Sequence, residues 1–81
     1  MEMKFAVRFK DDDRAKIACK IAETVRRSKS ECLITRGEKT RNAGSILMVM
    51  SLGLKDGDVV TLKSDNAKCI YEICNILRET K

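Results

Sequence analysis

Few side chains in this sequence could carry out chemistry: four cysteines, several serines and a run of acids, with no histidine among its 81 residues. Histidine is the side chain whose ordinary pKa lies nearest to neutral pH. Without it, the chain cannot form a Ser–His or Cys–His nucleophile pair, bind zinc through an imidazole, or carry a phosphohistidine. The sequence therefore excludes histidine chemistry before any fold is considered.

The four cysteines are Cys19, Cys32, Cys69 and Cys74. No two of them form a Cys-x-x-Cys motif, and the five-residue step from Cys69 to Cys74 does not place both thiols on one face of a helix. We therefore expect reduced thiols buried in the protein, with a metal site or a disulfide scaffold as the alternatives. No metal and no other cofactor is predicted.

Composition indicates a small folded protein. Apolar residues make up 43% of the chain and charged residues 36%, a balance typical of soluble globular domains. Residues 1–4 alternate with charge and lack the apolar core of a secretory signal. No stretch approaches the roughly 18 apolar residues of a membrane span. We therefore expect a single domain over residues 1–81, located in the cytoplasm.

The charge balance is basic, with 17 Lys and Arg against 12 acids and a net charge of +5. Nucleic acid, anionic lipid or acidic protein could bind such a chain. The signs are mixed along the sequence, however, and the densest run, residues 11–13, is acidic. The aromatic residues Phe5, Phe9 and Tyr71 are too few for a base-stacking platform. Solvated surface charge is the expected explanation, and a basic nucleic-acid-binding module is the alternative.

The spacing of apolar residues changes between the first predicted strand and the first predicted helix. Apolar and charged residues alternate over residues 3–9, which predicts a half-buried strand. The acids at 11–13 suit a helix start, because carboxylates accept hydrogen bonds from its free N–H groups and lie at the positive end of the helix dipole. Over residues 15–27, apolar side chains recur every four residues from Ile17, which predicts an amphipathic helix that ends at two arginines.

Two short strands and a short apolar helix come next. Residues 31–35 and 39–42 are predicted strands joined by a glycine-containing hairpin turn. Ser45 is placed to cap an apolar helix over residues 46–52. Gly53 follows as a left-handed cap that ends this helix.

A β-branched strand over residues 58–63 and a last helix complete the chain. Residues 64–66 are predicted to cap that helix. Its predicted buried stripe is Ile70, Ile73 and Leu77, with Cys69 and Ile76 at the edges. The order is therefore β-α-β-β-α-β-α, an α+β fold in which three helices cover one face of a four-stranded antiparallel sheet.

One stretch carries a family resemblance. Residues 45–54 read Ser-Ile-Leu-Met-Val-Met-Ser-Leu-Gly-Leu, and residues 55–62 read Lys-Asp-Gly-Asp-Val-Val-Thr-Leu. This stretch resembles the HPr family, the small phosphocarriers of the sugar phosphotransferase system, and is most similar to the Gram-positive type. Ser30, Gly37 and Lys39 also fit the family. The resemblance covers nearly the whole chain and implies an open-faced β-sandwich.

The chain departs from the family at its active site. HPr proteins carry a Gly-Leu-His-Thr-Arg-Pro-Ala motif at the start of the first helix, where residues 12–18 of this chain read Asp-Asp-Arg-Ala-Lys-Ile-Ala. Arg14 thus stands in the place of the phosphorylated histidine, and Lys16 in that of the arginine. A guanidinium is no usable nucleophile, and the acids at 11–13 compete for the N–H groups that would hold a phosphoryl group. We expect the phosphocarrier chemistry to be lost and the chain not to be an enzyme.

Ser45 is the predicted regulatory site. In Gram-positive HPr, the serine at this place is phosphorylated by the HPr kinase/phosphorylase, and the modified protein becomes a co-regulator of a catabolite-control transcription factor. A phosphate at a helix N-cap adds nearly two negative charges where the dipole and the free N–H groups favour them. The alternative is a serine that only caps the helix.

The short apolar helix is the predicted docking surface. A helix of two turns cannot bury all of its apolar residues, and exposed apolar patches with flexible methionines tend to bind partners. In HPr, this helix and the loop near the histidine dock Enzyme I, the kinase and the regulator. By resemblance, Ile46, Leu47 and Met50 form the docking face, with Arg14 and Lys16 nearby. The alternative is ordinary packing beneath the last helix.

The resemblance as a whole implies a regulatory or adaptor protein that works through protein contacts, as in the catabolite-repression branch of the family, which lacks the histidine and keeps the serine. We expect a monomer or weak homodimer that binds no membrane. A strict phosphotransferase component, a nucleic-acid-binding module and a drifted paralogue without retained activity are the alternatives.

Overall fold

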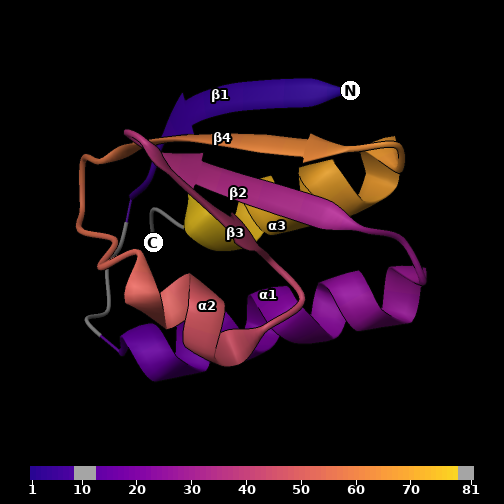
Figure 1. The fold of residues 1–81 in the computed structure, drawn as a ribbon, viewed down its shortest axis with the longest axis horizontal. Helices are drawn as coiled ribbons and strands as arrows, with labels where there is room; N and C mark the ends of the chain where they lie inside the picture. The colour runs from indigo at the N-terminus through magenta and orange to yellow at the C-terminus, as the bar shows by residue number, and fades with distance from the viewer. Residues whose placement is uncertain (9–12, 79–81) are drawn as a thin grey trace.

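The computed structural model describes residues 1–8 and 13–78, in which four strands form one antiparallel sheet and three helices cover one of its faces (Figure 1). The elements, in chain order, are β1 (Glu2–Ala6), α1 (Arg14–Ser28), β2 (Cys32–Arg36), β3 (Lys39–Asn42), α2 (Ile46–Ser51), β4 (Val59–Ser64) and α3 (Ala67–Leu77). The predicted order and the α+β fold class are confirmed.

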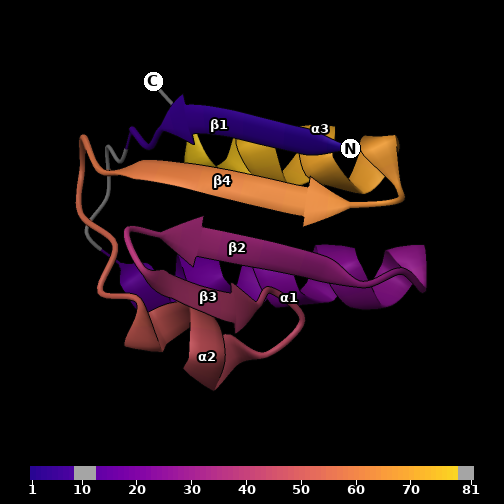
Figure 2. The ribbon, with the colours of Figure 1, turned by 45° about the horizontal axis from the view of Figure 1, so that its top comes forward.

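The sheet has the strand order β1-β4-β2-β3, so β4 and β2 are its central strands. Leu62 of β4 lies opposite Met3 of β1 on one side and Ile34 of β2 on the other. Leu62 and Ile34 are buried, whereas Val59 is exposed. Every second side chain therefore points into the core, and the opposite face of the sheet is bare (Figure 2).

The first strand is shorter than the predicted range of residues 3–9. It ends at Ala6 because the chain then leaves the ladder with β4: the N–H of Arg8 donates to the carbonyl of Leu77, 2.7 Å away, at the end of α3. Val7 is buried, as the alternating pattern predicted. Phe9 and the first two acids of the run 11–13 lie outside the described residues.

Helix α1 begins at Arg14, one residue earlier than predicted, because Asp13 caps it. The Asp13 carboxylate accepts a hydrogen bond from the backbone N–H of Lys16 at 3.0 Å, which satisfies one of the free donors of the first turn. At the other end, Lys29 adopts the left-handed conformation with a φ of 55° and donates to the carbonyl of Arg26. Asp13 thus starts the helix as predicted.

Helix α3 presents its predicted stripe to the core. Ile70, Ile73 and Leu77 are buried, and Ile76 packs at the edge. The prediction that Cys69 also lies at the edge is wrong, because only 1% of this residue is exposed. Cys32, the first residue of β2, is buried as well. None of the helices that the structure describes is long and apolar enough to span a bilayer.

The buried thiol of Cys32 is held in its neutral form. Removal from water, followed by the nearby Cys69 thiol, raises the pKa of Cys32 from its ordinary value of 9.0 to about 12. Desolvation disfavours the thiolate, and a second sulfur beside it adds to this effect. The folded protein therefore keeps the proton at pH values where the unfolded chain releases it.

We expect the free energy of unfolding to fall as the pH rises from about 9 towards 12, because only the unfolded chain then ionises Cys32. The contribution is complete below pH 9, and its loss amounts to at most about 1.4 kcal/mol per pH unit. Denaturant unfolding measures the free energy of unfolding at each pH. This free energy should fall less steeply with pH for Cys32→Ala than for the wild type. Val60→Ala, a core truncation without a titratable group, should keep the wild-type slope. Parallel curves for Cys32→Ala and wild type would contradict the prediction.

Candidate functional site

Helix α2 starts from a tight segment that brings it close to α1. The Ser45 backbone is extended, and its hydroxyl accepts a hydrogen bond from the N–H of Met48 at 3.3 Å, which confirms the predicted N-cap. One residue earlier, a Cβ on Gly44 would lie 3.2 Å from Cγ1 of Val25 in α1. Glycine at this position therefore lets the start of α2 approach α1 more closely than any other residue would allow.

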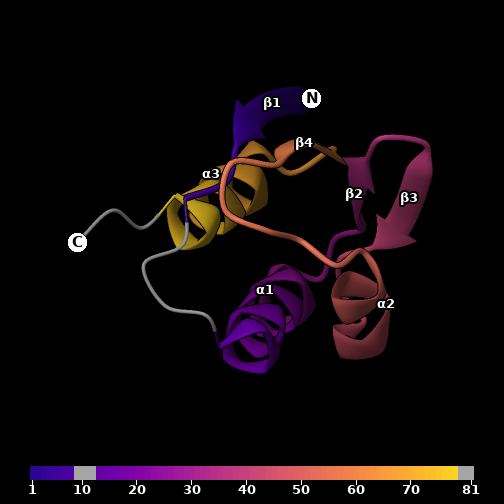
Figure 3. The same ribbon diagram turned by 90° about the vertical axis from the view of Figure 1, so that its left-hand side faces the viewer.

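The apolar residues of α2 divide into a buried set and an exposed set. Val49 is buried, and Ile46 is half-buried against the core. The exposed residues, which we call the α2 patch, are Leu47 (78% exposed), Met48 (41%) and Met50 (44%). The helix packs on α1 and β3 (Figure 3), so Leu47 and Met50 do not lie beneath α3.

Met48 belongs to the α2 patch although the sequence analysis left it out, and Ile46 contributes less exposed surface than expected. The helical spacing of the apolar residues could have predicted both the exposure of Met48 and the partial burial of Ile46. Ile46, Val49 and Leu52 follow one another at three-residue steps and mark the side of the helix that faces the core. Met48 lies off that side, so its side chain is left to solvent.

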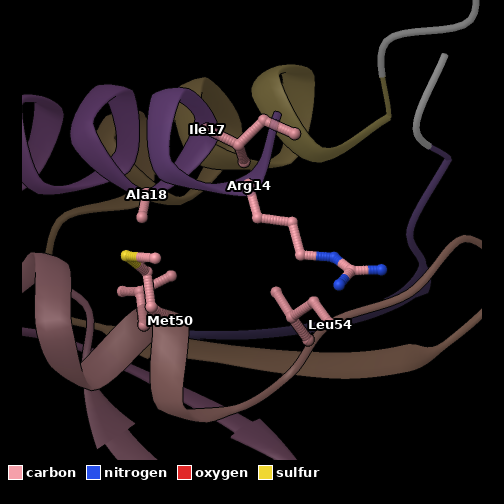
Figure 4. A pocket seen from close by; sticks show the side chains of 6 residues that line it. Arg14, Ile17, Ala18, Met50 and Leu54 are labelled. Atoms are coloured by element: carbon pink, nitrogen blue, oxygen red, sulfur yellow. The ribbon is translucent and has the colours of Figure 1, made fainter. Parts of the chain in front are cut away.

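The start of α1 and the α2 patch meet at a narrow cleft. Its walls are formed by Arg14, Ile17 and Ala18 of α1, by Val49 and Met50 of α2, and by Leu54, around a cavity of about 20 Å³. Figure 4 shows the Arg14 side chain extending from α1 towards Leu54, with Met50 facing Ala18. The structure therefore brings Arg14 and Met50 together. Lys16 is exposed on the first turn of α1 and does not line this cleft.

Comparison with known proteins decides the family. The family model PTS-HPr, described as the PTS HPr component phosphorylation site, matches residues 1–79. The chain belongs to the HPr family. Proteins of this family are phosphocarriers that work through protein partners and are not enzymes themselves. No curated protein matches the chain.

Solved HPr structures share this fold. The HPr of Bacillus anthracis has 21% identity and a TM-score of 0.86, over 96% of each chain. HPr-C-His of Thermoanaerobacter tengcongensis has 25% identity and a TM-score of 0.83, over 95% of this chain and 90% of that one. The catabolite repression protein Crh of Bacillus subtilis, described as a swapped dimer, has 18% identity and a TM-score of 0.63, over 100% of this chain and 94% of that one.

The family resemblance implies that the start of α1 is the place of the family's histidine, and the sequence of this chain contains no histidine. In the register of the family motif, Arg14 is the first residue of the helix, and the Asp13 carboxylate is bound to the N–H of Lys16. A negatively charged group thus already occupies a donor of the first turn. In the part of the chain that the structure describes, no group of three or more metal-ligating side chains accompanies it.

Contacts of Arg36 and Asp58, which we call the clamp, hold the end of α2. The sequence did not predict them. The guanidinium of Arg36 contacts the carboxylate of Asp58 at 2.8 Å through Nε and donates to the carbonyl of Leu52 at 2.8 Å through Nη1. The same carboxylate oxygen of Asp58 accepts the N–H of Lys55 at 2.8 Å. These bonds join β2, the end of α2 and the turn before β4. The partners are far apart in sequence and follow no local pattern, so only the fold reveals them.

We expect Arg36→Met to lower the free energy of unfolding by about 1–2 kcal/mol, because it removes a charged hydrogen bond to a helix carbonyl together with an ion pair that is two-thirds buried. Arg41→Met is the matched control: Arg41 Nε contacts the exposed hydroxyl of Ser51 at 3.2 Å, and its loss should stay within about 0.5 kcal/mol. Urea denaturation measures both. Equal losses in the two variants would show that the clamp has no special role.

Proposed function

We propose that this HPr-family chain is a regulatory or adaptor protein that does not carry a phosphoryl group on histidine and acts by contact with other proteins. One observation carries the proposal: the exposed α2 patch lies beside a helix start that has Arg14 in the place of the family's histidine. We further propose that residues 1–81 act as one domain in the cytoplasm, as a monomer or weak homodimer.

The loss of phosphocarrier chemistry is supported at the start of α1. A guanidinium such as that of Arg14 is no usable nucleophile for phosphorus. The N–H of Lys16, which would otherwise be available to a phosphoryl oxygen, is bound by the Asp13 carboxylate. An incoming phosphate would have to displace this carboxylate and would be repelled by its charge. The absent nucleophile and the occupied donor thus act in the same direction.

The docking role is supported by the chemistry of the exposed surface. Leu47 and the two methionines of the α2 patch offer apolar contact area with adaptable side chains. Arg14, across the cleft from Met50, adds a positive charge to the wall of the cleft. This surface suits a partner that presents an apolar side chain next to an acidic one. By family resemblance, such partners are the HPr kinase/phosphorylase and a regulator of the catabolite-control type.

Ser45 is the proposed switch. Its residue is half-exposed, and the 3.3 Å bond from Met48 N–H to its hydroxyl is itself exposed, so a kinase can reach the oxygen with little rearrangement. A phosphate there would carry nearly two negative charges to the N-terminus of α2, where backbone N–H groups can donate hydrogen bonds to its oxygens. Because Leu47 and Met48 follow directly, the modification would change the docking surface without unfolding the domain.

We expect a purified HPr kinase/phosphorylase with ATP to phosphorylate the wild-type chain and Ser51→Ala but not Ser45→Ala. Ser51 is the matched control, since it is an exposed serine on the same helix. Mass spectrometry locates the phosphate, and a histidine-containing HPr serves as the positive control. A wild-type chain that stays unmodified while that HPr is labelled would refute the switch.

The same preparation tests the loss of phosphocarrier chemistry. Incubation with Enzyme I and phosphoenolpyruvate should leave this chain unlabelled while it labels the control HPr. An acid-labile phosphoryl adduct on this chain would refute the proposal.

We expect Leu47→Asp to weaken binding of the kinase/phosphorylase at least tenfold, because it places a charge in the centre of the apolar contact. Its thermal unfolding should stay close to that of the wild type, since Leu47 is 78% exposed. Tyr71→Asp, which changes an exposed apolar residue on α3, should bind as tightly as the wild type. Calorimetric titration measures the three affinities. Equal affinities for Leu47→Asp and wild type would exclude the α2 patch as the contact.

A further inference from the structure

A polar hollow of about 330 Å³ lies between the last turns of α1 and the first turns of α3. Figure 1 shows these two helix ends at the same end of the molecule. Arg27, which lines the hollow, lies about 20 Å along the helix axis from Arg14, at the usual rise of about 1.5 Å per residue. The hollow takes no part in the proposed docking or phosphorylation, so an inference about it stands apart from the proposed function.

Hydrogen bonds hold the walls of the hollow together. The amide of Asn66, the N-cap of α3, donates to the hydroxyl of Ser30 at 3.2 Å, and its side-chain oxygen accepts the N–H of Cys69 at 3.2 Å. The hydroxyl of Ser28, at the end of α1, accepts the N–H of Ser30 at 3.2 Å. Asn66 and Ser28 both line the hollow. Its polar walls are therefore ordered before any ligand arrives, which lowers the entropy cost of binding.

The hollow has a buried floor and a charged rim. Thr24 and Cys69 line it with only 3% and 1% of these residues exposed. Arg27 of α1 and Lys68 of α3 are exposed, so each helix contributes one cation. In the part of the chain that the structure describes, neither of these two side chains forms an ion pair or a hydrogen bond. Both positive charges are therefore available to a ligand in the hollow.

The charges of the side chains decide which ligand the hollow attracts. The carbonyl end of α1 and the N–H end of α3 both border it, and the opposite partial charges of these helix ends offset each other. Two cations against a single acid, Glu72, leave a net positive charge among the lining side chains. An anionic group is therefore favoured, and the Glu72 carboxylate can accept a hydrogen bond from a hydroxyl of the same ligand.

We propose that the hollow is a binding site for a small phosphate monoester that also carries hydroxyl groups, a polyol phosphate. Arg27 and Lys68 bind the phosphate, whose three oxygens allow one group to bridge cations from two helices. Glu72 accepts a hydrogen bond from a hydroxyl of the ligand. The volume of about 330 Å³ is at the lower end of the range of small-molecule sites, roughly 300–1,000 Å³, which suits a ligand of a few carbon atoms.

Glu72 makes the site selective among phosphates. Its carboxylate repels the charge of any phosphate in the hollow, and a bare phosphate gains little in return. A polyol phosphate offsets this repulsion, because its hydroxyl donates a hydrogen bond to the charged carboxylate. We therefore expect the hollow to bind a polyol phosphate more tightly than inorganic phosphate.

The test adds glycerol 3-phosphate to the nitrogen-15-labelled full chain at neutral pH and follows the backbone amide resonances by NMR. We expect saturable shifts at the residues that line the hollow and none in the α2 patch. Glycerol, which lacks the phosphate, should cause no saturable shift. Inorganic phosphate should bind at least about threefold more weakly than glycerol 3-phosphate, because it lacks the hydroxyl that reaches Glu72.

Variants of the lining residues assign the contacts. Arg27→Gln and Lys68→Gln should each weaken the binding of glycerol 3-phosphate about two- to fivefold, the effect of one exposed ion pair. Arg26→Gln is the matched control, because Arg26 is an exposed arginine in the same turn of α1 that does not line the hollow. This control should bind like the wild type. Glu72→Ala should abolish the preference for glycerol 3-phosphate over inorganic phosphate.

Four results would overturn the proposal. No saturable shift at the hollow would exclude the site, and equal affinities for the two phosphates would leave an adventitious ion only. Equal weakening by Arg26→Gln and Arg27→Gln would assign the binding to general surface charge. Retention of the chain on phosphatidylcholine vesicles that contain phosphatidic acid, a phosphate monoester without hydroxyl groups, would assign it to a membrane surface. A cooperative unfolding transition for each variant shows that folded proteins are compared.

Discussion

The short helix α2 depends on contacts outside itself. A helix of six residues forms few internal hydrogen bonds and would not persist in water alone. It is held at its start by the Ser45 cap and by the close approach at Gly44, and at its end by Arg36, which binds the Leu52 carbonyl. Asp58 fixes the guanidinium of Arg36 in turn. The exposed α2 patch has a defined shape only because both ends are held in this way.

Charge at the start of α1 gives the protein its second distinguishing feature. By the family resemblance, HPr proteins carry their nucleophile at this helix start. In this chain the Asp13 carboxylate accepts the N–H of Lys16, and Arg14 is the first residue of the helix. Under the proposed function, this helix start serves contact with a partner and not the transfer of a phosphoryl group.

Local patterns in the sequence predicted most of the fold. The period of two in β1, the period of about four in α1, the cap at Ser45 and the left-handed Gly53, with a φ of 61°, all appear in the structure. Each of these features depends on residues that are only a few positions apart in the sequence. The predicted end of the first strand lies beyond its observed end at Ala6, because Arg8 bonds to the distant Leu77.

Properties that depend on residues distant in sequence could not be predicted in this way. The burial of Cys69 depends on the packing of α3 against α1 and β4, and the bond from Arg36 to Leu52 joins two different elements. In the site, the sequence indicated Leu47, Met50 and Arg14 but not that Arg14 and Met50 share a cleft. That proximity follows from the packing of α2 on α1, which no local pattern specifies.

The close approach of α2 to α1 at Gly44 also bears on the proposed docking surface. A Cβ on Gly44 would lie against the Val25 side chain, so the start of α2 packs tightly on α1. Under the proposed function, a partner therefore meets a main chain that is already ordered. The side chains on top of this frame are Leu and Met, which change rotamer easily. The proposed docking surface therefore combines a packed backbone with a layer of flexible side chains, which would fit partners of different shape without movement of the helices.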